Sequence, residues 1–395
     1  MTPSSGHFVP TTGHIRQVRD GALEVVSVNG QAFVPNPLPP ALPDELYGRL
    51  LSDIHDATAA LMRLESLIQS LPDPQILLTP MRRREVAYSS KIENTIAAVQ
   101  EVALAEINTA DQRAEVLEVR NNLKALDLGA QSPLPMCLRL IREMHKELMT
   151  GVRGGEKTPG EFRTGQVFIG KDGPDAFRHA RFVPPPPGQI LHDCLSEYEK
   201  FLNPGPGRER PKKVLLLELA MSHYQFESIH PFSDGNGRLG RLIITLTGFK
   251  TGELAFPLPY ISRYLEANRQ EYYDRMLAVS QQGNWEGWFR FFCRAVLADC
   301  VDGADRARRL LKLRETYREK LQTARNSSLL LKLVDLLFKN TAVTVVTVRV
   351  ALSITAPPAQ KHIQTLVDLG VLREITGGNY ARVWVADAIL NVIET

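Results

Sequence analysis

Apolar residues recur at helical spacing along most of this chain, which predicts a mainly α-helical protein. Ile92, Ile96, Val99, Ala103 and Ile107 fall at positions i, i+4, i+7, i+11 and i+15, on one face of a helix. Further apolar or amphipathic blocks predict helices over 136–150, 190–203, 213–229, 237–249 and 304–324. The last of these helices is rich in arginine and lysine and is expected to connect two domains.

Two segments depart from the helical pattern. Residues 1–43 are rich in Pro, Gly and Thr and are expected to form an extended arm. The apolar stretches 166–169 and 177–183 lie on either side of the turn-forming sequence Lys171-Asp172-Gly173-Pro174. This arrangement predicts a small β-hairpin between two helices.

The C-terminal segment has a pattern of its own. Helices are expected over 329–339, 345–352 and 359–369, with two short strands around Thr376-Gly377-Gly378-Asn379. A helix-turn-helix followed by a hairpin is a winged-helix pattern. The breaks divide the chain into an extended arm (1–43), an N-terminal helical region (44–130), a core (131–300), a connecting helix (301–326) and a winged helix-turn-helix domain (327–395).

Composition narrows the class of protein. A chain of 395 residues with 44% hydrophobic and 23% charged residues can form packed domains. Its net charge of +3 is too small to indicate a nucleic-acid coat or membrane adhesion. The four cysteines form no CxxC pair, and we see no signal peptide and no apolar run long enough to span a bilayer. We therefore expect a reduced, cytoplasmic protein with no membrane partner.

One loop, between the helices expected at 213–229 and 237–249, concentrates polar chemistry. His230 precedes a proline, which disfavours helical backbone at His230, so the first helix should end near residue 229. Phe232 can anchor the loop in the core. Gly235 and Gly237 permit positive φ and a close backbone approach, and the free N–H groups at the start of the next helix can bind an anion.

Charged side chains in the same loop favour a polyphosphate as that anion. Arg238 and Arg241 lie near a helix N-terminus, where a cation costs about 0.3–1 kcal/mol unless an anion compensates. Asp234 is a lone carboxylate beside this site, which suits Mg²⁺ bound to phosphates. A neutral His230 beside a nucleotide can act as general base for an incoming hydroxyl. Each feature alone is more often structural, but their combination within twelve residues favours function.

The sequence His230-Pro-Phe-Ser-Asp-Gly-Asn-Gly-Arg-Leu-Gly-Arg241 resembles the signature of the Fic family, with every signature position filled. The resemblance implies a Fic-type helical core with a small β-hairpin flap and a protein adenylyltransferase activity. AMP would pass from ATP to a Ser, Thr or Tyr hydroxyl of a target protein, and pyrophosphate would leave. A related group that transfers phosphate has Lys at the position of Gly237, so glycine at both 235 and 237 favours AMP transfer.

The resemblance also implies a role for each residue of the loop. His230 would deprotonate the target hydroxyl, and Asp234 would hold Mg²⁺ between the α- and β-phosphates. The residues implied to bind the phosphates are Gly235, Asn236, Gly237 and Arg238, with Arg241 at the γ-phosphate.

Other segments extend the resemblance. Pro159-Gly-Glu-Phe-Arg163, the expected hairpin and Ala180-Arg-Phe-Val-Pro-Pro185 resemble the family's flap region, which binds a target segment by strand addition. Ile261-Ser-Arg-Tyr264, with Asn268 and Tyr272, resembles the segment near adenine and ribose.

An upstream motif resembles the family's inhibitory motif. Ser89 and Glu93 are four residues apart on the early helix, and Asn94 follows. The resemblance implies that Glu93 pairs with Arg241, which would prevent ATP from placing its γ-phosphate productively. The protein would then be autoinhibited within one chain.

Two alternatives to AMP transfer remain open. The helix expected at 359–369 exposes Gln360, Lys361 and Gln364 and could enter a DNA groove, so the chain could be a DNA-binding regulator with a nucleotide-sensing core. From residue 325 onward there are seven basic and five acidic residues, a weak charge signal, and protein docking or homodimerisation fits as well. Removal of AMP from a target, with Glu93 activating water, is the second alternative, and self-modification is also possible.

Overall fold

A computed structural model describes residues 5–19, 22–98, 100–102, 104, 113–170, 176–203, 214–323, 328–377 and 382–394. The chain forms two compact units. The first consists of Met1–Thr58, Lys124–Pro259 and Ala267–Leu297. The second consists of Ala59–Leu123, Tyr260–Glu266 and Ala298–Thr395. Helices α1 (Asp44–Gln69), α4 (Ala114–Gln131) and α11 (Trp285–Thr323) have residues in both.

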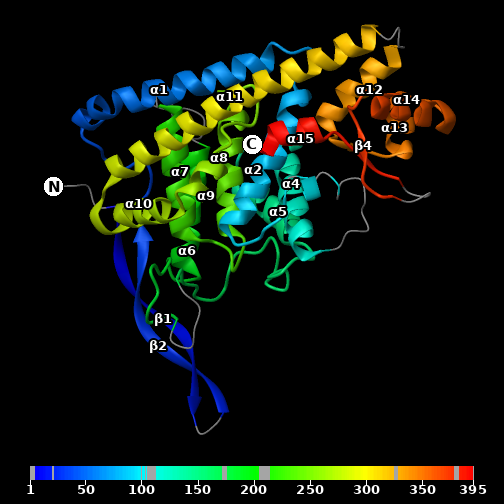
Figure 1. Ribbon diagram of the computed structural model, residues 1–395. Coiled ribbons are helices and arrows are strands. Elements are labelled where there is room, and N and C mark those ends of the chain that lie inside the picture. Colours follow the sequence, from blue (N-terminus) through cyan, green and yellow to red (C-terminus); the bar gives the residue numbers. More distant parts are fainter. Residues whose placement is uncertain are drawn as a thin grey trace. The chain divides into compact units, whose positions relative to one another are not determined.

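The helices wholly within the first unit are α5 (Leu138–Met149), α6 (Gln189–Leu202), α7 (Leu215–Ile229), α8 (Asn236–Lys250) and α10 (Arg269–Gln282). Four of them confirm the helices expected at 136–150, 190–203, 213–229 and 237–249. Helix α7 packs against α8, α6 and β2 (Figure 1). It is buried on nearly all sides, since 13 of its 15 residues are buried. The helix is therefore a central element of this unit.

The N-terminal segment, expected as an extended arm, forms a long β-hairpin. Strands β1 (Gly6–Arg19) and β2 (Ala22–Pro35) pair antiparallel in continuous register from Gly6↔Pro35 to Arg19↔Ala22. They appear as the two long blue arrows of Figure 1. Two residues, Asp20 and Gly21, connect the strands in the sequence. Asp-Gly is a strong two-residue hairpin signal, and the Pro- and Gly-rich composition obscured it.

Of the hairpin expected at 166–183, the described residues show an antiparallel bridge between Ile169 and Phe182. Its expected turn, Lys171-Asp172-Gly173-Pro174, lies outside the described residues. Residues of this segment contact strands β1 and β2. The Phe33 N–H donates to Val183 O at 2.8 Å, and the ring of Phe177 lies so close to Gly13 that a Cβ there would be 2.3 Å from it. The N-terminal hairpin thus supports the candidate flap.

The elements wholly within the second unit are α2 (Gln75–Ile92), α12 (Ser328–Lys339), β3 (Ala342–Val343), α13 (Val345–Leu352), α14 (Ala356–Asp368), β4 (Arg373–Glu374), β5 (Trp384–Val385) and α15 (Asp387–Glu394). The short helix α9 (Ser262–Ala267) lies here except for its last residue. Helix α2 packs against α12 and α15. Strands β3, β5 and β4 form an antiparallel sheet in that order.

The prediction of one continuous helical face from Ile92 to Ile107 is wrong for the described residues of this segment. Helix α2 ends at Ile92, and Asn94 adopts φ 64, a left-handed conformation that stops a helix. Ile96 is 72% exposed instead of buried. Asparagine tolerates this conformation better than most residues, which explains why the helix ends here despite continued apolar spacing. Val99, Ala103 and Ile107 lie outside the described residues.

The helices and strands expected in the C-terminal segment are present as α12, α13, α14, β4 and β5. Thr344 begins α13 with a capping box, in which it and Thr347 exchange hydrogen bonds. Gly378 and Asn379, between the two expected strands, lie outside the described residues. A winged helix remains our interpretation of this arrangement. The connecting helix was expected at 304–324. Its predicted start is wrong, because α11 runs unbroken from Trp285 to Thr323.

Candidate active site

His230 occupies the loop between α7 and α8 with an unusual backbone. It is the C-cap of α7, at φ 49 and ψ 61, and the helix ends at Ile229 as the following Pro231 predicts. Its Nδ1 lies 3.3 Å from the Glu227 carbonyl oxygen and 3.9 Å from Glu227 Oε2. A carbonyl oxygen only accepts hydrogen bonds, so Nδ1 carries the proton and Nε2 keeps its lone pair. This is the tautomer that a general base needs.

Asn236 closes the loop that His230 begins. Its Oδ1 accepts from the Phe232 N–H at 2.9 Å, and its Nδ2 donates to Phe232 O at 2.8 Å. Phe232 is fully buried, as expected. Both polar atoms of the Asn236 side chain are engaged in this way. We therefore expect Asn236 to contact phosphate through its backbone N–H. Gly235 adopts φ 75 at the N-cap of α8, where most other residues would be strained.

Two cations lie in the first turns of α8. Arg238 and Arg241 are 4% and 2% exposed, and Arg238 Nη2 lies 3.4 Å from Met149 Sδ. Two guanidinium groups and the backbone N–H groups of the first turn thus lie together at the positive end of the α8 dipole. Such a helix N-terminus suits an anion.

Asp234 provides a carboxylate at the same helix start. Its Oδ1 accepts from the Gly235 N–H at 2.7 Å, and its Oδ2 lies 3.3 Å from Lys157 Nζ. The side chain is 38% exposed. A Cβ on Gly154 would be 2.5 Å from Oδ2, so only glycine leaves room for the carboxylate. An exposed carboxylate with an exchangeable lysine partner fits Mg²⁺, which usually keeps waters and binds one or two carboxylates.

His145 clamps this loop, and the sequence analysis missed it. The Gly160 N–H donates to His145 Nδ1 at 2.8 Å, so Nε2 carries the proton and donates to Asp234 O at 3.0 Å. The ring stacks on Phe232 at a centroid distance of 3.7 Å. His145 thus joins α5, the Pro159–Arg163 segment and the loop. The only sequence signal was a histidine on the buried face of an amphipathic helix.

The burial of His145 predicts acid sensitivity. Burial lowers the pKa of His145 to about 4, and of His223 to about 3, from 6.5. The unfolded chain binds more protons than the folded chain below pH 6.5, so stability is full above that pH and falls as the pH drops from 6.5 toward the folded pKa. His145 alone should cost about 3 kcal/mol of unfolding free energy at pH 4 relative to pH 7.

Urea unfolding at pH 7 and at pH 4 checks this expectation. His145→Gln should lower stability at pH 7 and reduce its pH dependence, whereas His179→Gln, at an exposed histidine, should change neither. Equal pH dependence in wild type and His145→Gln would contradict the expectation.

Arg163 forms a second clamp that the sequence analysis did not assign. Its guanidinium is 3% exposed and donates to the carbonyl oxygens of His230 (2.8 Å), Pro185 (2.6 Å) and Gly165 (3.1 Å). Its backbone N–H donates to Pro231 O at 2.9 Å. Burial lowers the pKa of Arg163 to about 10, which leaves it charged at neutral pH. One side chain therefore fixes the His230 peptide and both stems of the flap.

The residues of the expected inhibitory motif lie together at the end of α2 in the second unit. Ser89 is 1% exposed, and Glu93 is the C-cap of the helix. The Thr95 N–H donates to Ser90 O at 3.0 Å, which completes the left-handed cap at Asn94. The helix terminus that carries Glu93 is therefore held in a defined geometry.

The expected adenine and ribose residues are divided between the units. Tyr264 belongs to the second unit, where its N–H donates to Asp299 Oδ2 at 3.0 Å. Asn268 is the N-cap of α10 in the first unit. Tyr272 is 1% exposed, and its hydroxyl lies 2.6 Å from His223 Nε2. We leave Tyr272 out of the proposed site because it belongs to the core.

Comparison with known families decides the family of this region. Residues 51–131 match the model of the Fic/DOC family N-terminal region, and residues 135–247 match the model of the Fic/DOC family. These residues belong to the Fic/DOC family. The Fic region includes α7, the His230–Arg241 loop and most of α8, together with the helix that carries Glu93.

Curated relatives extend the comparison. This chain is similar to "Protein adenylyltransferase Fic" from Drosophila grimshawi, at 28% identity over 262 residues, 64% of this chain and 45% of the relative. The protein of the same name from Aedes aegypti is 29% identical over 231 residues, 55% of this chain and 40% of the relative. The chain thus spans less than half of each relative's length.

A solved structure shows the fold. A Fic family protein from Desulfovibrio desulfuricans G20 aligns with a TM-score of 0.52 at 18% identity, over 88% of this chain and 98% of that one. The fold is therefore a mainly helical Fic fold. Within the described residues, none of the helices combines the length and apolar composition that crossing a bilayer requires.

Proposed function

We propose that this protein transfers AMP from ATP to a Ser, Thr or Tyr hydroxyl of a protein target and releases pyrophosphate. The observation that carries the proposal is the loop itself. It holds a histidine whose Nδ1 lies 3.3 Å from the Glu227 carbonyl oxygen, a carboxylate and two buried arginines around one helix N-terminus. The names of the curated relatives support the same reaction.

The residues of the loop divide the chemistry among them. Nε2 of His230 would accept the proton of the target hydroxyl, whose oxygen then attacks the α-phosphorus in line with the leaving pyrophosphate. The backbone at Gly235–Gly237, with Arg238, would hold the α- and β-phosphates, and Arg241 would hold the γ-phosphate. Catalysis would rest on positioning and on charge neutralisation.

Asp234 would hold Mg²⁺, which would neutralise negative charge on the phosphates when bound. Lys157 would then release the carboxylate that it contacts at 3.3 Å. This exposed ion pair is weak enough to be exchanged, since such pairs contribute at most about 1 kcal/mol.

We further propose that Glu93 restrains the activity through Arg241. The support is the motif at Ser89, Glu93 and Asn94 together with the match to the family's N-terminal region, in which the motif lies. The fixed helix end at Asn94 would present the carboxylate in one place.

Transfer of label from ATP tests the proposed function. Protein incubated with Mg²⁺ and ATP labelled at the α-phosphate should become labelled itself or should label proteins of a lysate. His230→Ala should remove this label while leaving the fold intact, because His230 is part of an irregular loop with its side chain 20% exposed. Labelling that persists in His230→Ala would refute the assigned role of His230.

A further inference from the structure

Lys157 brings a further cation to the loop between α7 and α8. Its Nζ lies 3.3 Å from Oδ2 of Asp234, the carboxylate that we assign to Mg²⁺. Oδ1 of the same carboxylate accepts from the Gly235 N–H at the start of α8. Lys157 belongs to the loop after α5, so the ammonium reaches this carboxylate from a distant segment of the chain. The contact adds a lysine to a site that already holds Arg238 and Arg241.

The loop that carries Lys157 has a defined backbone. The Lys157 N–H donates to Gly154 O at 3.0 Å, which closes a turn before the lysine. Thr158 follows at φ 49, a left-handed conformation that is strained for a β-branched residue and persists only where its surroundings impose it. The Gly160 N–H donates to His145 Nδ1 at 2.8 Å, which holds the far end of the loop. The structure thus fixes the backbone on both sides of Lys157 and presents its ammonium to the carboxylate.

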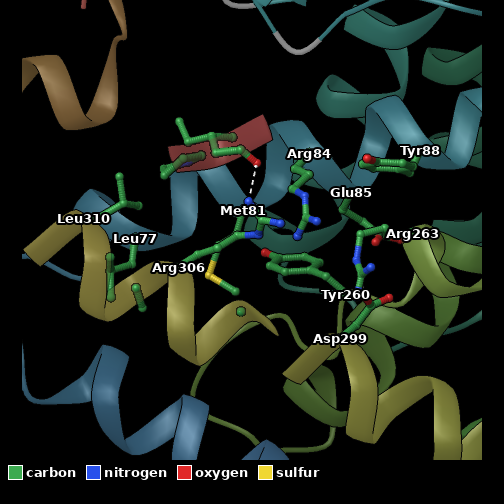
Figure 2. Close-up of a pocket in the computed structure, with 14 residues that line it drawn as sticks. Leu77, Met81, Arg84, Glu85, Tyr88, Tyr260, Arg263, Asp299, Arg306 and Leu310 are labelled. Carbon is green, nitrogen blue, oxygen red and sulfur yellow. Dashed lines mark hydrogen bonds and ion pairs between the residues drawn. The ribbon is translucent and has the colours of Figure 1, made fainter. Parts of the chain in front are cut away.

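The pair between Lys157 and Asp234 is exposed, and among the described residues it is made by one ammonium–oxygen contact. The two side chains are 47% and 38% exposed. An ion pair at the cavity of the second unit is different (Figure 2). There Arg263 binds one oxygen of Asp299 through two nitrogen atoms, each at 2.8 Å, and the Asp299 side chain is 4% exposed. Exposed pairs contribute little to stability, so the Lys157 pair is suited to exchange and the Arg263 pair is not.

A divalent metal on Asp234 would change the balance of charges around Lys157. It would neutralise the carboxylate and repel the ammonium. The phosphates that we assign to the α8 N-terminus are then the anions available to Lys157. A lysine suits this exchange because its compact charge lies at the end of a flexible stem. The pyrophosphate part of ATP gains negative charge as it leaves, so a cation that contacts it would assist its departure.

We propose that Lys157 is an exchangeable cation of this site. It pairs with Asp234 while no metal is bound, and it binds the pyrophosphate part of the nucleotide once a metal occupies the carboxylate. The choice of ligand rests on the function proposed above, but binding is measured without AMP transfer. A protein that binds pyrophosphate in this way and transfers no AMP would refute the proposed function alone.

Inorganic pyrophosphate is the probe, and isothermal titration calorimetry of the full chain measures its affinity with and without Mg²⁺. With Mg²⁺, Lys157→Gln should weaken pyrophosphate binding about tenfold, because a charge-assisted contact is lost. Without Mg²⁺, the loss should be no more than about threefold, the screened effect of a charge that is not in contact with the ligand. Lys200→Gln is the matched control, because Lys200 is 55% exposed and pairs with Glu197 on α6 at 2.5 Å. It should change neither affinity.

A second substitution tests the exchange without any metal. Asp234→Asn removes the charge that holds Lys157 and keeps a side chain of the same size. In metal-free solution, Lys157→Gln should therefore weaken pyrophosphate binding about tenfold in the Asp234→Asn background and much less in the wild type. Thermal unfolding midpoints should stay unchanged, because both side chains are partly exposed. Equal effects of Lys157→Gln with and without Mg²⁺ and in both backgrounds, or no loss of affinity under any condition, would overturn the proposal.

Discussion

Arg163→Lys should lower the rate of AMP transfer by about 100-fold or more, because small displacements of reacting groups cost that much. The arginine bonds four carbonyl oxygens, of His230, Pro185, Gly165 and Ile229, which an ammonium group on a single stem cannot reach together. The His230 peptide and the flap stems would then shift independently. The carbonyls left without partners should also cost about 1–3 kcal/mol each.

The control for this substitution is Arg142→Lys. Arg142 bonds the Gly160 carbonyl at 2.8 Å but is 41% exposed, so water can replace the lost contact. Steady-state labelling, thermal unfolding and ATP binding should be measured for both variants. Arg163→Lys should still bind ATP, since the α8 N-terminus is unchanged, and should lose its rate. A near-normal rate in a folded Arg163→Lys protein would show that the clamp does not position His230.

Glu93→Gly should raise AMP transfer by about 5- to 150-fold, the usual range for coupling between a regulatory and an active site. The reason is that Arg241 would no longer be engaged by a carboxylate and could bind the γ-phosphate. Glu93→Gln separates charge from backbone flexibility, because it removes the charge without adding a glycine beside Asn94. It should reproduce most of the increase.

Rates of labelling at saturating ATP measure this effect. A rate that rises in Glu93→Gly and not in Glu93→Gln would assign the effect to the helix end instead of the charge. A rate that falls in both variants would contradict inhibition by Glu93. Release of AMP from a labelled target that depends on Glu93 would favour the alternative in which Glu93 activates water to remove AMP.

The loop between α7 and α8 could be predicted from the sequence because its signals are local. Pro231 ends α7, and Gly235 and Gly237 mark the turn into α8. The break after Ile92 was missed because apolar residues continue at helical spacing, while the decisive feature is one left-handed residue, Asn94. Local backbone conformation outweighed hydrophobic periodicity there.

The two clamps could not be predicted because their partners are backbone carbonyl and amide groups from distant segments. Arg163 bonds groups at positions 165, 185 and 230, and His145 bonds groups at 160 and 234. Such contacts leave no pattern of residue types. The N-terminal hairpin did have a sequence signal, the dipeptide Asp20-Gly21. The prediction of an arm relied on the Pro, Gly and Thr content of residues 1–43 instead.

The most direct test of the account compares ATP labelled at the α-phosphate with ATP labelled at the γ-phosphate, using the Glu93→Gly protein with and without His230→Ala. We expect protein-bound label only from the α-position, and none from either position once His230 is replaced. Label from the γ-position, or α-label that survives His230→Ala, would contradict AMP transfer with His230 as the base.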